Sequence, residues 1–306
     1  MSQALPATCY MSSRFRDHDP GPWHPERPER YDAVAAAAVA AGAVQAEAPA
    51  APLTAIERVH SAAYVDAVER FCRGGGGALD PDTIMHEASW EAALRAAGGA
   101  MAAVDHVARH PGSAAFSLGR PPGHHAETAR AMGFCIINSA AVAAAHALAE
   151  LGCARVAVVD WDAHHGNGTQ AIFYDDPSVL YVSLHQYPFY PGTGAAGERG
   201  VGDGVGATVN VPLGAGTGRD EYLDAFRTVA LPAVTSFEPE VLIVSAGFDA
   251  HRDDPLCALG LDADGFAEMA TALREICGGP ALVLEGGYSL PALESSVASV
   301  LGAVSR

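Results

Sequence analysis

Five polar side chains follow one apolar run near the middle of the chain, in the stretch VVDWDAHHGNGTQAIF. They are Asp160, Asp162, His164, His165 and Asn167. In an extended segment, residues i, i+2 and i+4 project to one face, so Asp160, Asp162 and His164 would converge. An ordinary polar loop after a strand is the alternative. Carboxylates and an imidazole at strictly alternate positions favour a metal or catalytic site.

Four further polar clusters come directly after short apolar runs. One carries the tandem histidines His124 and His125, and the others carry His185, Asp249 and Tyr288. In open α/β sheets, ligands bind beyond the carboxyl ends of the strands. Because five separate segments deliver polar groups at such ends, we predict that these groups meet at one edge of a sheet.

Asp162, His164 and Asp249 form a plausible set of three metal ligands that leaves a fourth position open. Catalytic zinc sites have this form, whereas structural zinc sites are closed by four protein ligands. No cysteine stands within the polar clusters, which disfavours a closed site. We expect Zn²⁺, with Fe²⁺ or Mn²⁺ as alternatives, because oxygen-rich sites discriminate poorly between divalent ions.

The tandem histidines His124 and His125 follow Pro-Pro-Gly, a stiff turn that would hold both rings in place. Two adjacent imidazoles opposite a carboxylate-rich strand end indicate a general base and acid that act on a metal-activated water. We expect Asp160 to orient one ring and Asn167 the other. A neutral partner such as Asn167 would not raise the basicity of its ring as a carboxylate would.

Tyr288 ends the segment Glu285-Gly286-Gly287-Tyr288, in which two flexible residues would let the phenol swing over the metal. Its hydroxyl could then donate a hydrogen bond to an oxyanion that forms at a carbonyl. A core tyrosine beside a tight turn is the alternative, and this motif alone leaves both open.

The elements that must position these residues alternate between strand-like and helix-like runs. This pattern predicts a single α/β domain over residues 1–306, with a mostly parallel central sheet and helices on both faces. The expected strands are Ala114–Leu118, Arg155–Asp160, Val179–Leu184, Thr208–Val211, Val241–Ser245 and Ala281–Leu284. The expected helices are Glu29–Ala41, Ser61–Phe71, Ser89–Arg109, Ser139–Leu151, Asp220–Phe237, Asp264–Ile276 and Pro291–Val304. Gly74–Gly77 and Gly192–Gly206 are expected to be surface loops.

Composition limits the partners and the setting. The chain has 18 basic and 36 acidic side chains, and its formal net charge of −18 disfavours nucleic acid as a partner. No apolar run approaches the roughly 20 residues that span a membrane, and the start lacks a signal-peptide pattern. The six cysteines are widely spaced, which favours a reduced, cytoplasmic setting. A homo-oligomer is compatible with the sequence.

Seven motifs spread over nearly the whole chain resemble the histone deacetylase family of the arginase–deacetylase fold. Five of them contain the candidate site residues: RPPGHHA…MGFC, DWDAHHGNGTQ, YVSLHQ…FYPGTG, SAGFDAHRDDPL and LEGGY. WHPERPERYDAV and VHSAAYVDAV match the family's amino-terminal pattern. The resemblance implies Zn²⁺ held by Asp162, His164 and Asp249. It also implies His125 as general base and acid, His124 as its electrostatic partner and Tyr288 as the group that polarises the carbonyl.

The same resemblance implies a substrate tunnel and a second type of metal ion. The tunnel would be sized for an acylated lysine and lined by Gly133, Phe134, Tyr190 and Leu256. A K⁺ ion is implied near Asp160, Asp162, His164, Ser183 and Leu184.

Departures from the family's patterns place the chain within it. Asn167 stands where class I enzymes have Asp, which is the class II-like pattern of bacterial amidohydrolases, and Tyr288 is retained. The long amino-terminal insertion typical of bacterial acetylpolyamine deacetylases is absent from the sequence, which disfavours a polyamine substrate. His86 and Glu87 differ from the sequences expected at the rim of the tunnel.

The sequence therefore predicts a zinc-dependent amidohydrolase that removes acetyl or related acyl groups from acylated lysine side chains or similar amines. A deacetylase of acetylpolyamines or other small acyl-amines is the first alternative. A binuclear Mn²⁺ ureohydrolase of the same fold would need a further Asp where His251 stands. A non-catalytic acyl-amine binding protein would be expected to have lost a ligand, a tandem histidine or Tyr288.

Overall fold

The short apolar runs form strands whose two faces are both covered by other parts of the chain. In β6 (Val156–Asp160), Ala157 and Val159 belong to one hydrophobic core, whereas Val156 and Val158 belong to the other. Successive side chains of a strand point to opposite faces, so a strand between two cores must be apolar throughout. The central strands therefore read as continuous hydrophobic runs.

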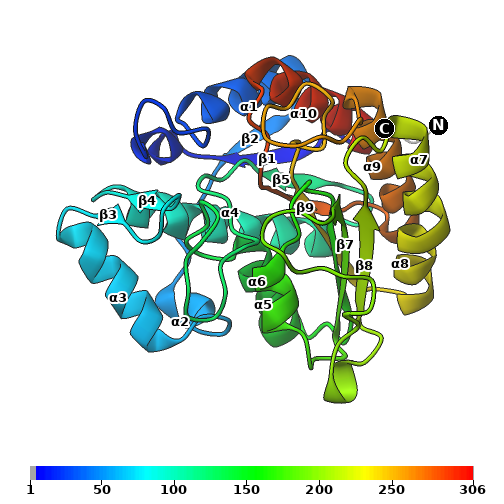
Figure 1. Cartoon of the computed structure of the whole chain (residues 1–306), viewed down its shortest axis with the longest axis horizontal. Coiled ribbons are helices and arrows are strands. Elements are labelled where there is room, and N and C mark those ends of the chain that lie inside the picture. Colours follow the sequence, from blue (N-terminus) through cyan, green and yellow to red (C-terminus); the bar gives the residue numbers. More distant parts are fainter. Residues whose placement is uncertain (1–4, 306) are drawn as a thin grey trace.

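The computed structural model describes residues 5–305, so residues 1–4 of the segment examined for a signal peptide lie outside the described part. Eight strands form one parallel sheet in the order β2-β1-β5-β10-β9-β6-β7-β8 (Figure 1). The strands besides β6 are β1 Thr8–Met11, β2 Val44–Glu47, β5 Ala115–Ser117, β7 Val179–Gln186, β8 Thr208–Leu213, β9 Val241–Ala246 and β10 Ala281–Leu284. A separate antiparallel pair consists of β3 (Gly77–Ala78) and β4 (Ile84–Met85).

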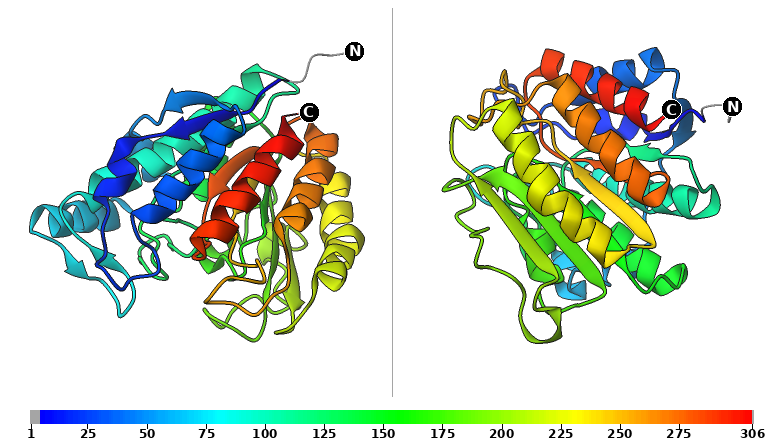
Figure 2. Two further views of the ribbon diagram at one scale, coloured as in Figure 1. Left: turned by 90° about the horizontal axis from the view of Figure 1, so that it is seen from above. Right: turned by 90° about the vertical axis from the view of Figure 1, so that its right-hand side faces the viewer.

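Helices cover both faces of the sheet (Figures 1 and 2). One layer contains α1 Glu29–Ala40, α7 Arg219–Ala225, α8 Leu231–Phe237, α9 Ala263–Cys277 and α10 Leu290–Val304. The other contains α2 Leu53–Ile56, α3 Ala62–Arg73, α4 Ser89–Arg109, α5 Ser139–Glu150 and α6 Asn167–Ile172. The predicted α/β domain with a parallel sheet and helices on both faces is confirmed.

Every expected strand and helix is present, with small shifts at the ends. The expected helix Asp220–Phe237 is divided into α7 and α8 by a π-helical segment, Phe226–Ala230. Strands β1 and β2 were not predicted. Strand β1 has only four residues, and the side chains of β2 are mostly exposed at the edge of the sheet, where no apolar run is needed. Gly77 begins β3, so the expected loop Gly74–Gly77 is wrong at its last residue. Within residues 5–305, no helix has the length and apolar character needed to cross a membrane.

Candidate active site

The polar clusters meet because the strands that carry them are neighbours. Strands β5, β10, β9, β6 and β7 are consecutive in the sheet and run in the same direction. Their carboxyl ends therefore lie along one edge, as predicted. The strand geometry proposed for the first cluster is wrong in detail, because β6 ends at Asp160 and residues 162–164 form bends. Asp162 and His164 converge through these bends, not by alternation along a strand.

The three expected metal ligands lie together at this edge. Nδ1 of His164 is 2.9 Å from Oδ2 of Asp249 and 3.2 Å from Oδ1 of Asp162. Both carboxylates are fully buried, and the imidazole is largely buried. Metal–ligand distances of about 2.0–2.1 Å place the ligand atoms of a tetrahedral ion roughly 3.3 Å apart, so the observed spacing fits such an ion.

The charges of these three groups also suit a cation. Burial opposes protonation of His164, but its hydrogen bonds with Asp162 and Asp249 raise the pKa of the imidazole well above the ordinary value. Burial and the neighbouring Asp162 raise the pKa of Asp249 to about 7. Two carboxylates held this close repel each other, and a divalent cation between them would offset the repulsion.

Backbone amides fix the orientation of the two carboxylates. The N–H of Gly286 donates to Oδ2 of Asp162 (2.8 Å), and the N–H of Ala163 donates to Oδ1 of Asp249 (2.7 Å). A Cβ atom at Gly286 would lie 2.5 Å from Oδ2 of Asp249 and 2.6 Å from Oδ2 of Asp162. Gly286 is therefore required because the ligands approach its backbone so closely, and not for the flexibility that the sequence suggested.

The far side of the His164 ring faces a cysteine. Nε2 of His164 lies 3.6 Å from Sγ of Cys257, a residue eight positions after Asp249. The sequence placed no cysteine within the polar clusters, and the chain brings this one in from the loop after β9. Cys257 thus lies behind the ring, whose Nδ1 faces the carboxylates.

The tandem histidines have partners of different charge. Nδ1 of His124 is 3.0 Å from Oδ2 of Asp160, which also accepts the hydroxyl of Tyr181 at 3.0 Å. Nδ1 of His125 is 2.8 Å from Oδ1 of Asn167. The amide nitrogen of Asn167 donates to Glu127, which leaves its oxygen to face the imidazole. His125 therefore carries its proton on Nδ1, and its Nε2 is free to accept one.

These partners separate the protonation states of the two rings. Burial opposes charge on His124, but the carboxylates of Asp160 and Asp162 outweigh it and raise the pKa of His124 to about 10. Burial, together with positive charge on His124 and His164, lowers the pKa of His125 well below the usual histidine range. At neutral pH the pair consists of one cation and one neutral base.

Tyr288 is held by contacts on several sides. Arg30 donates through Nε to the carbonyl of Gly287 (2.7 Å), and its guanidinium carbon lies 5.0 Å from the centroid of the Tyr288 ring. The ring of Phe134 packs edge-on against it with centroids 5.8 Å apart. The predicted free swing of the phenol is not supported, because the chain before Tyr288 is hydrogen-bonded at each residue from Glu285 to Gly287.

A buried ionic cluster supports this corner of the site and was missed from the sequence. Oε1 of Glu26 accepts hydrogen bonds from Nε of Arg120 (2.5 Å) and Nη1 of Arg30 (2.9 Å). Its Oε2 lies 3.2 Å from Nε2 of His18. All four side chains are almost fully buried. The spacing of Glu26 and Arg30, four residues apart, was the available signal, but helix α1 begins only at Glu29 and the pair reads equally well as a solvated surface pair.

A pocket of about 190 Å³ opens onto these groups. It is lined by His125, His164 and Tyr288 and by all four expected tunnel residues, Gly133, Phe134, Tyr190 and Leu256. Asp82, which was not predicted, also lines it. The pocket therefore brings together one candidate metal ligand, His164, one tandem histidine and the phenol, while Asp162 and Asp249 are fully buried and contact His164.

Of the residues expected near K⁺, Asp160, Ser183 and Leu184 lie on the adjacent strands β6 and β7, and Asp162 and His164 lie in the bend after β6. Asp160 stands opposite Ser183 in the register of the two strands, and both residues and Leu184 are fully buried. The hydroxyl of Ser183 lies 2.8 Å from Nδ1 of His185. Asp160 and Ser183 are thus buried neighbours on adjacent strands, next to the bend that carries Asp162 and His164.

His86 and Glu87 do not line the pocket. Nε2 of His86 accepts the backbone N–H of Asp19 at 2.6 Å, and Glu87 is exposed. His86 therefore ties the loop before α1 to the segment around β4. This hydrogen bond gives His86 a structural role, whereas the sequence had left its part in the rim of the tunnel undecided.

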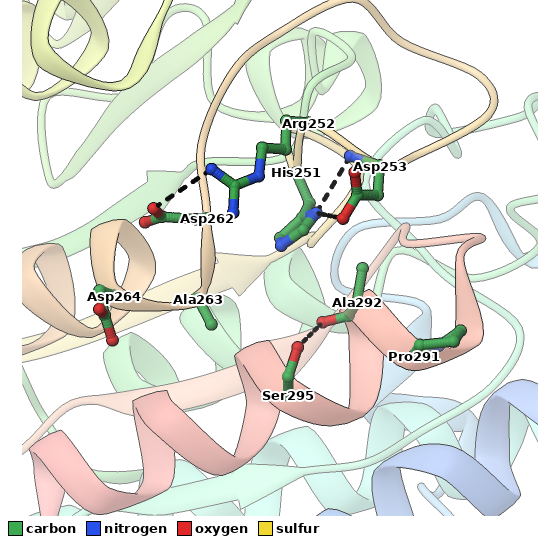
Figure 3. A pocket seen from close by; sticks show the side chains of 9 residues that line it. All are labelled: His251, Arg252, Asp253, Asp262, Ala263, Asp264, Pro291, Ala292 and Ser295. Atoms are coloured by element: carbon green, nitrogen blue, oxygen red, sulfur yellow. Dashed lines mark hydrogen bonds and ion pairs between the residues drawn. The ribbon is translucent and has the colours of Figure 1, made fainter.

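A larger depression of about 360 Å³ lies over the starts of α9 and α10 (Figure 3). Two pairs of its polar side chains lie near each other: Nη1 of Arg252 lies 3.9 Å from Asp262, and Nδ1 of His251 lies 3.7 Å from Asp253. None of the candidate metal ligands, tandem histidines or tunnel residues lines it. The chemistry of the site therefore belongs to the smaller pocket.

Comparison with known proteins agrees with this arrangement. Residues 24–304 match the family described as "Histone deacetylase domain". The chain is 43% identical over 298 residues to an uncharacterised protein of Synechocystis, covering 95% of this chain and 96% of that one. It is 44% identical over 238 residues to a histone deacetylase-like amidohydrolase of Pseudomonas aeruginosa, covering 76% of this chain and 63% of that one. The crystal structure of the HDA15 HD domain superposes with a TM-score of 0.92 at 40% identity, covering 97% and 90% of the two chains.

Proposed function

Because the chain belongs to the histone deacetylase family, we propose that it is a zinc-dependent amidohydrolase that removes acetyl or related acyl groups from acylated lysine side chains or similar amines. The observation that carries this proposal is the spacing at His164, whose Nδ1 lies within 3.2 Å of oxygens of both Asp162 and Asp249. Of these three groups, His164 lines a pocket together with a neutral imidazole, His125, and the phenol of Tyr288.

Asp162, His164 and Asp249 are the proposed zinc ligands, and Fe²⁺ or Mn²⁺ would fit the same donors. A divalent cation held there would polarise the amide carbonyl and make a water molecule more acidic. The remaining roles belong to side chains of the protein.

His125 is the proposed general base and acid. Its Nδ1–H is held by Asn167, so Nε2 is left to accept a proton from the attacking water and to return one to the leaving amine. The neighbouring cation on His124, fixed by Asp160, would stabilise negative charge that develops at the carbonyl. The hydroxyl of Tyr288 would donate a hydrogen bond to the same oxygen.

The walls of the pocket favour an acylated lysine. Phe134, Tyr190 and Leu256 offer apolar surface to a straight alkyl chain, and Gly133 leaves room beside His125 because it has no side chain. A Cβ atom at Gly133 would lie 2.4 Å from Cδ2 of His125. A small acylated amine could enter the same pocket and is the alternative substrate.

We further propose a K⁺ ion near Asp160, Asp162, His164, Ser183 and Leu184. The support is the pairing of Asp160 with Ser183 in the register of adjacent strands, together with the burial of both. Carboxylate, hydroxyl and carbonyl oxygens are suitable ligands for such a cation. Activity in K⁺ buffer compared with activity in a tetramethylammonium buffer of equal ionic strength would test this ion.

The decisive experiment is an activity screen of the purified protein. Acetyl-lysine peptides, trifluoroacetyl-lysine, acetylpolyamines and longer acyl-lysines are incubated with protein that has been loaded with Zn²⁺ and with protein treated with a chelator. We expect hydrolysis by the loaded protein, loss of activity with the chelator, and inhibition by a hydroxamate. Absence of turnover of every acyl-amine by metal-loaded, folded protein would overturn the proposed function.

A further inference from the structure

Asp254 joins two walls of the pocket that come from different strand ends. Its Oδ2 accepts the backbone N–H groups of Tyr288 (2.7 Å) and Ser289 (3.4 Å). Its Oδ1 accepts the backbone N–H of Leu256 (3.0 Å). Leu256 lies in the loop after β9, and Tyr288 follows β10, so one carboxylate fixes the backbone of both.

The neighbouring carboxylate shows how unusual this placement is. Asp253 is 68% exposed, and its side chain lies 3.7 Å from Nδ1 of His251. Asp254 is 7% exposed, and both of its carboxylate oxygens accept hydrogen bonds from backbone N–H groups. Burial of a carboxylate is costly unless its oxygens accept strong hydrogen bonds. Asp254 meets this condition through the backbone N–H groups of Leu256, Tyr288 and Ser289.

The backbone of Tyr288 needs these hydrogen bonds because of the conformation of the glycine before it. Gly287 has a φ of +122°, a backbone conformation that side chains rarely adopt, so the chain turns sharply just before the tyrosine. Arg30 holds the carbonyl of Gly287 from one side, and Asp254 holds the N–H of Tyr288 from the other. These two contacts fix the direction in which the Tyr288 side chain leaves the backbone.

We propose that Asp254 is a positioning residue for the reaction, which sets the phenol of Tyr288 at the correct height above the metal ligands and against the Leu256 wall. This inference rests on the proposed amidohydrolase function. Nothing in it requires Asp254 to touch the substrate. Because a displacement of about 1 Å at a catalytic group can cost on the order of a hundred-fold in rate, a loosened Tyr288 should be visible in kcat.

The test compares Asp254→Asn with Asp253→Asn, the same substitution one residue earlier at an exposed side chain. The Asn side chain has about the same volume as Asp, but its NH₂ group is a donor. It would face one set of the backbone N–H groups and could not accept their hydrogen bonds. We expect kcat on an acetyl-lysine peptide to fall about 10- to 100-fold for Asp254→Asn, with KM changed less than about three-fold. Asp253→Asn should behave as wild type, and the metal content of both should equal that of wild type.

A double-mutant cycle with Tyr288→Phe separates positioning from general destabilisation. If Asp254 acts through the phenol, adding Asp254→Asn to Tyr288→Phe should lower kcat by less than about three-fold, because the phenol is already absent. The proposal would be overturned if the fold reductions in kcat of the two single variants multiply in the double variant. It would also be overturned by an Asp254→Asn enzyme with wild-type kcat. Wild-type protein without activity would instead reject the proposed function itself.

A second variant covers the case in which Asp254→Asn folds poorly. Asp254→Ser removes the carboxylate without placing an amide donor opposite the backbone N–H groups. This variant is measured in the same double-mutant cycle, and thermal unfolding shows whether it is folded. We expect the same fall in kcat as for Asp254→Asn, and the same small effect when Tyr288→Phe is already present. An Asp254→Ser enzyme that is folded and has the kcat of wild type would also overturn the positioning role.

Discussion

Nδ1 of His125 lies 2.8 Å from Oδ1 of Asn167, so the imidazole that faces the pocket is paired with a neutral amide. The adjacent His124 is paired instead with the carboxylate of Asp160, at 3.0 Å. This difference gives two neighbouring rings opposite protonation states. It makes one of them suitable as a base and the other as a fixed positive charge.

Asn167→Asp should shift the pH dependence of the reaction. A carboxylate against Nδ1 would stabilise the protonated ring and raise the pKa of His125. His125 must be neutral to accept a proton, so the acid limb of kcat/KM should move to higher pH. The measurement is a kcat/KM profile of both proteins from pH 5 to 9. An acid limb at the same pH in the two proteins would show that His125 is not the base.

Asp249→Asn and His164→Ala should each abolish stoichiometric metal binding and turnover, because each removes one of three proposed ligands. Elemental analysis of purified protein gives the metal content, and Asp253→Asn serves as the control with full occupancy. Full zinc occupancy in either ligand variant would reject this assignment.

Gly286→Ala should weaken metal binding without changing any proposed ligand. Its Cβ would lie within 2.6 Å of carboxylate oxygens of both Asp162 and Asp249, so the two ligands would be pushed apart. We expect the metal dissociation constant to rise at least about ten-fold, as happens when ligand orientation is disturbed. The matched control is Gly302→Ala in α10, where a Cβ would meet nothing within 4 Å. Equal metal affinity in the two variants would contradict the close-approach explanation.

Stability should respond to the protonation of His60, which lies outside the pocket. Its Nε2 accepts the N–H of Asn138 (2.9 Å), and its Nδ1 lies 2.9 Å from the carbonyl of Glu127. Burial lowers the pKa of His60 to about 4. The unfolded chain therefore binds this proton more readily, and the native state loses stability as pH falls from about 6.5 toward 4.

His60→Gln removes this pH-dependent penalty. The variant should be less stable than wild type at pH 7, and its deficit in the free energy of unfolding should shrink by about 2 kcal/mol at pH 5. Urea unfolding at the two pH values measures the change, and the exposed His110→Gln provides the control. A deficit that is the same at both pH values would show that His60 is protonated equally in the folded and unfolded states.

The sequence predicted the location of the site because the ends of strands can be recognised from apolar runs followed by polar residues. His124, Asp162, Asp249 and Tyr288 each follow an apolar run, and parallel strands bring such positions to one edge whatever their distance along the chain. Residue types then restricted the chemistry. The order of strands in the sheet was not predictable, since it depends on which helices pack on which face.

The supporting residues could not be found in this way. Arg30 reaches a carbonyl 257 residues away, and Asp254 accepts an amide 34 residues away. Neither contact leaves a pattern in the local sequence. Gly286 was interpreted as flexible because a glycine's need for space depends on neighbours that come from other strands.

Tyr288→Phe tests the central claim most directly, with kcat, KM and zinc content measured on an acetyl-lysine peptide. The hydroxyl contributes little to ground-state binding of a neutral amide, but it donates to the carbonyl oxygen as negative charge develops. We expect kcat to fall on the order of a hundred- to a thousand-fold, roughly 3–4 kcal/mol, with KM and zinc content near those of wild type. A Tyr288→Phe enzyme that keeps most of its kcat would show that the phenol is structural and would contradict the proposed mechanism.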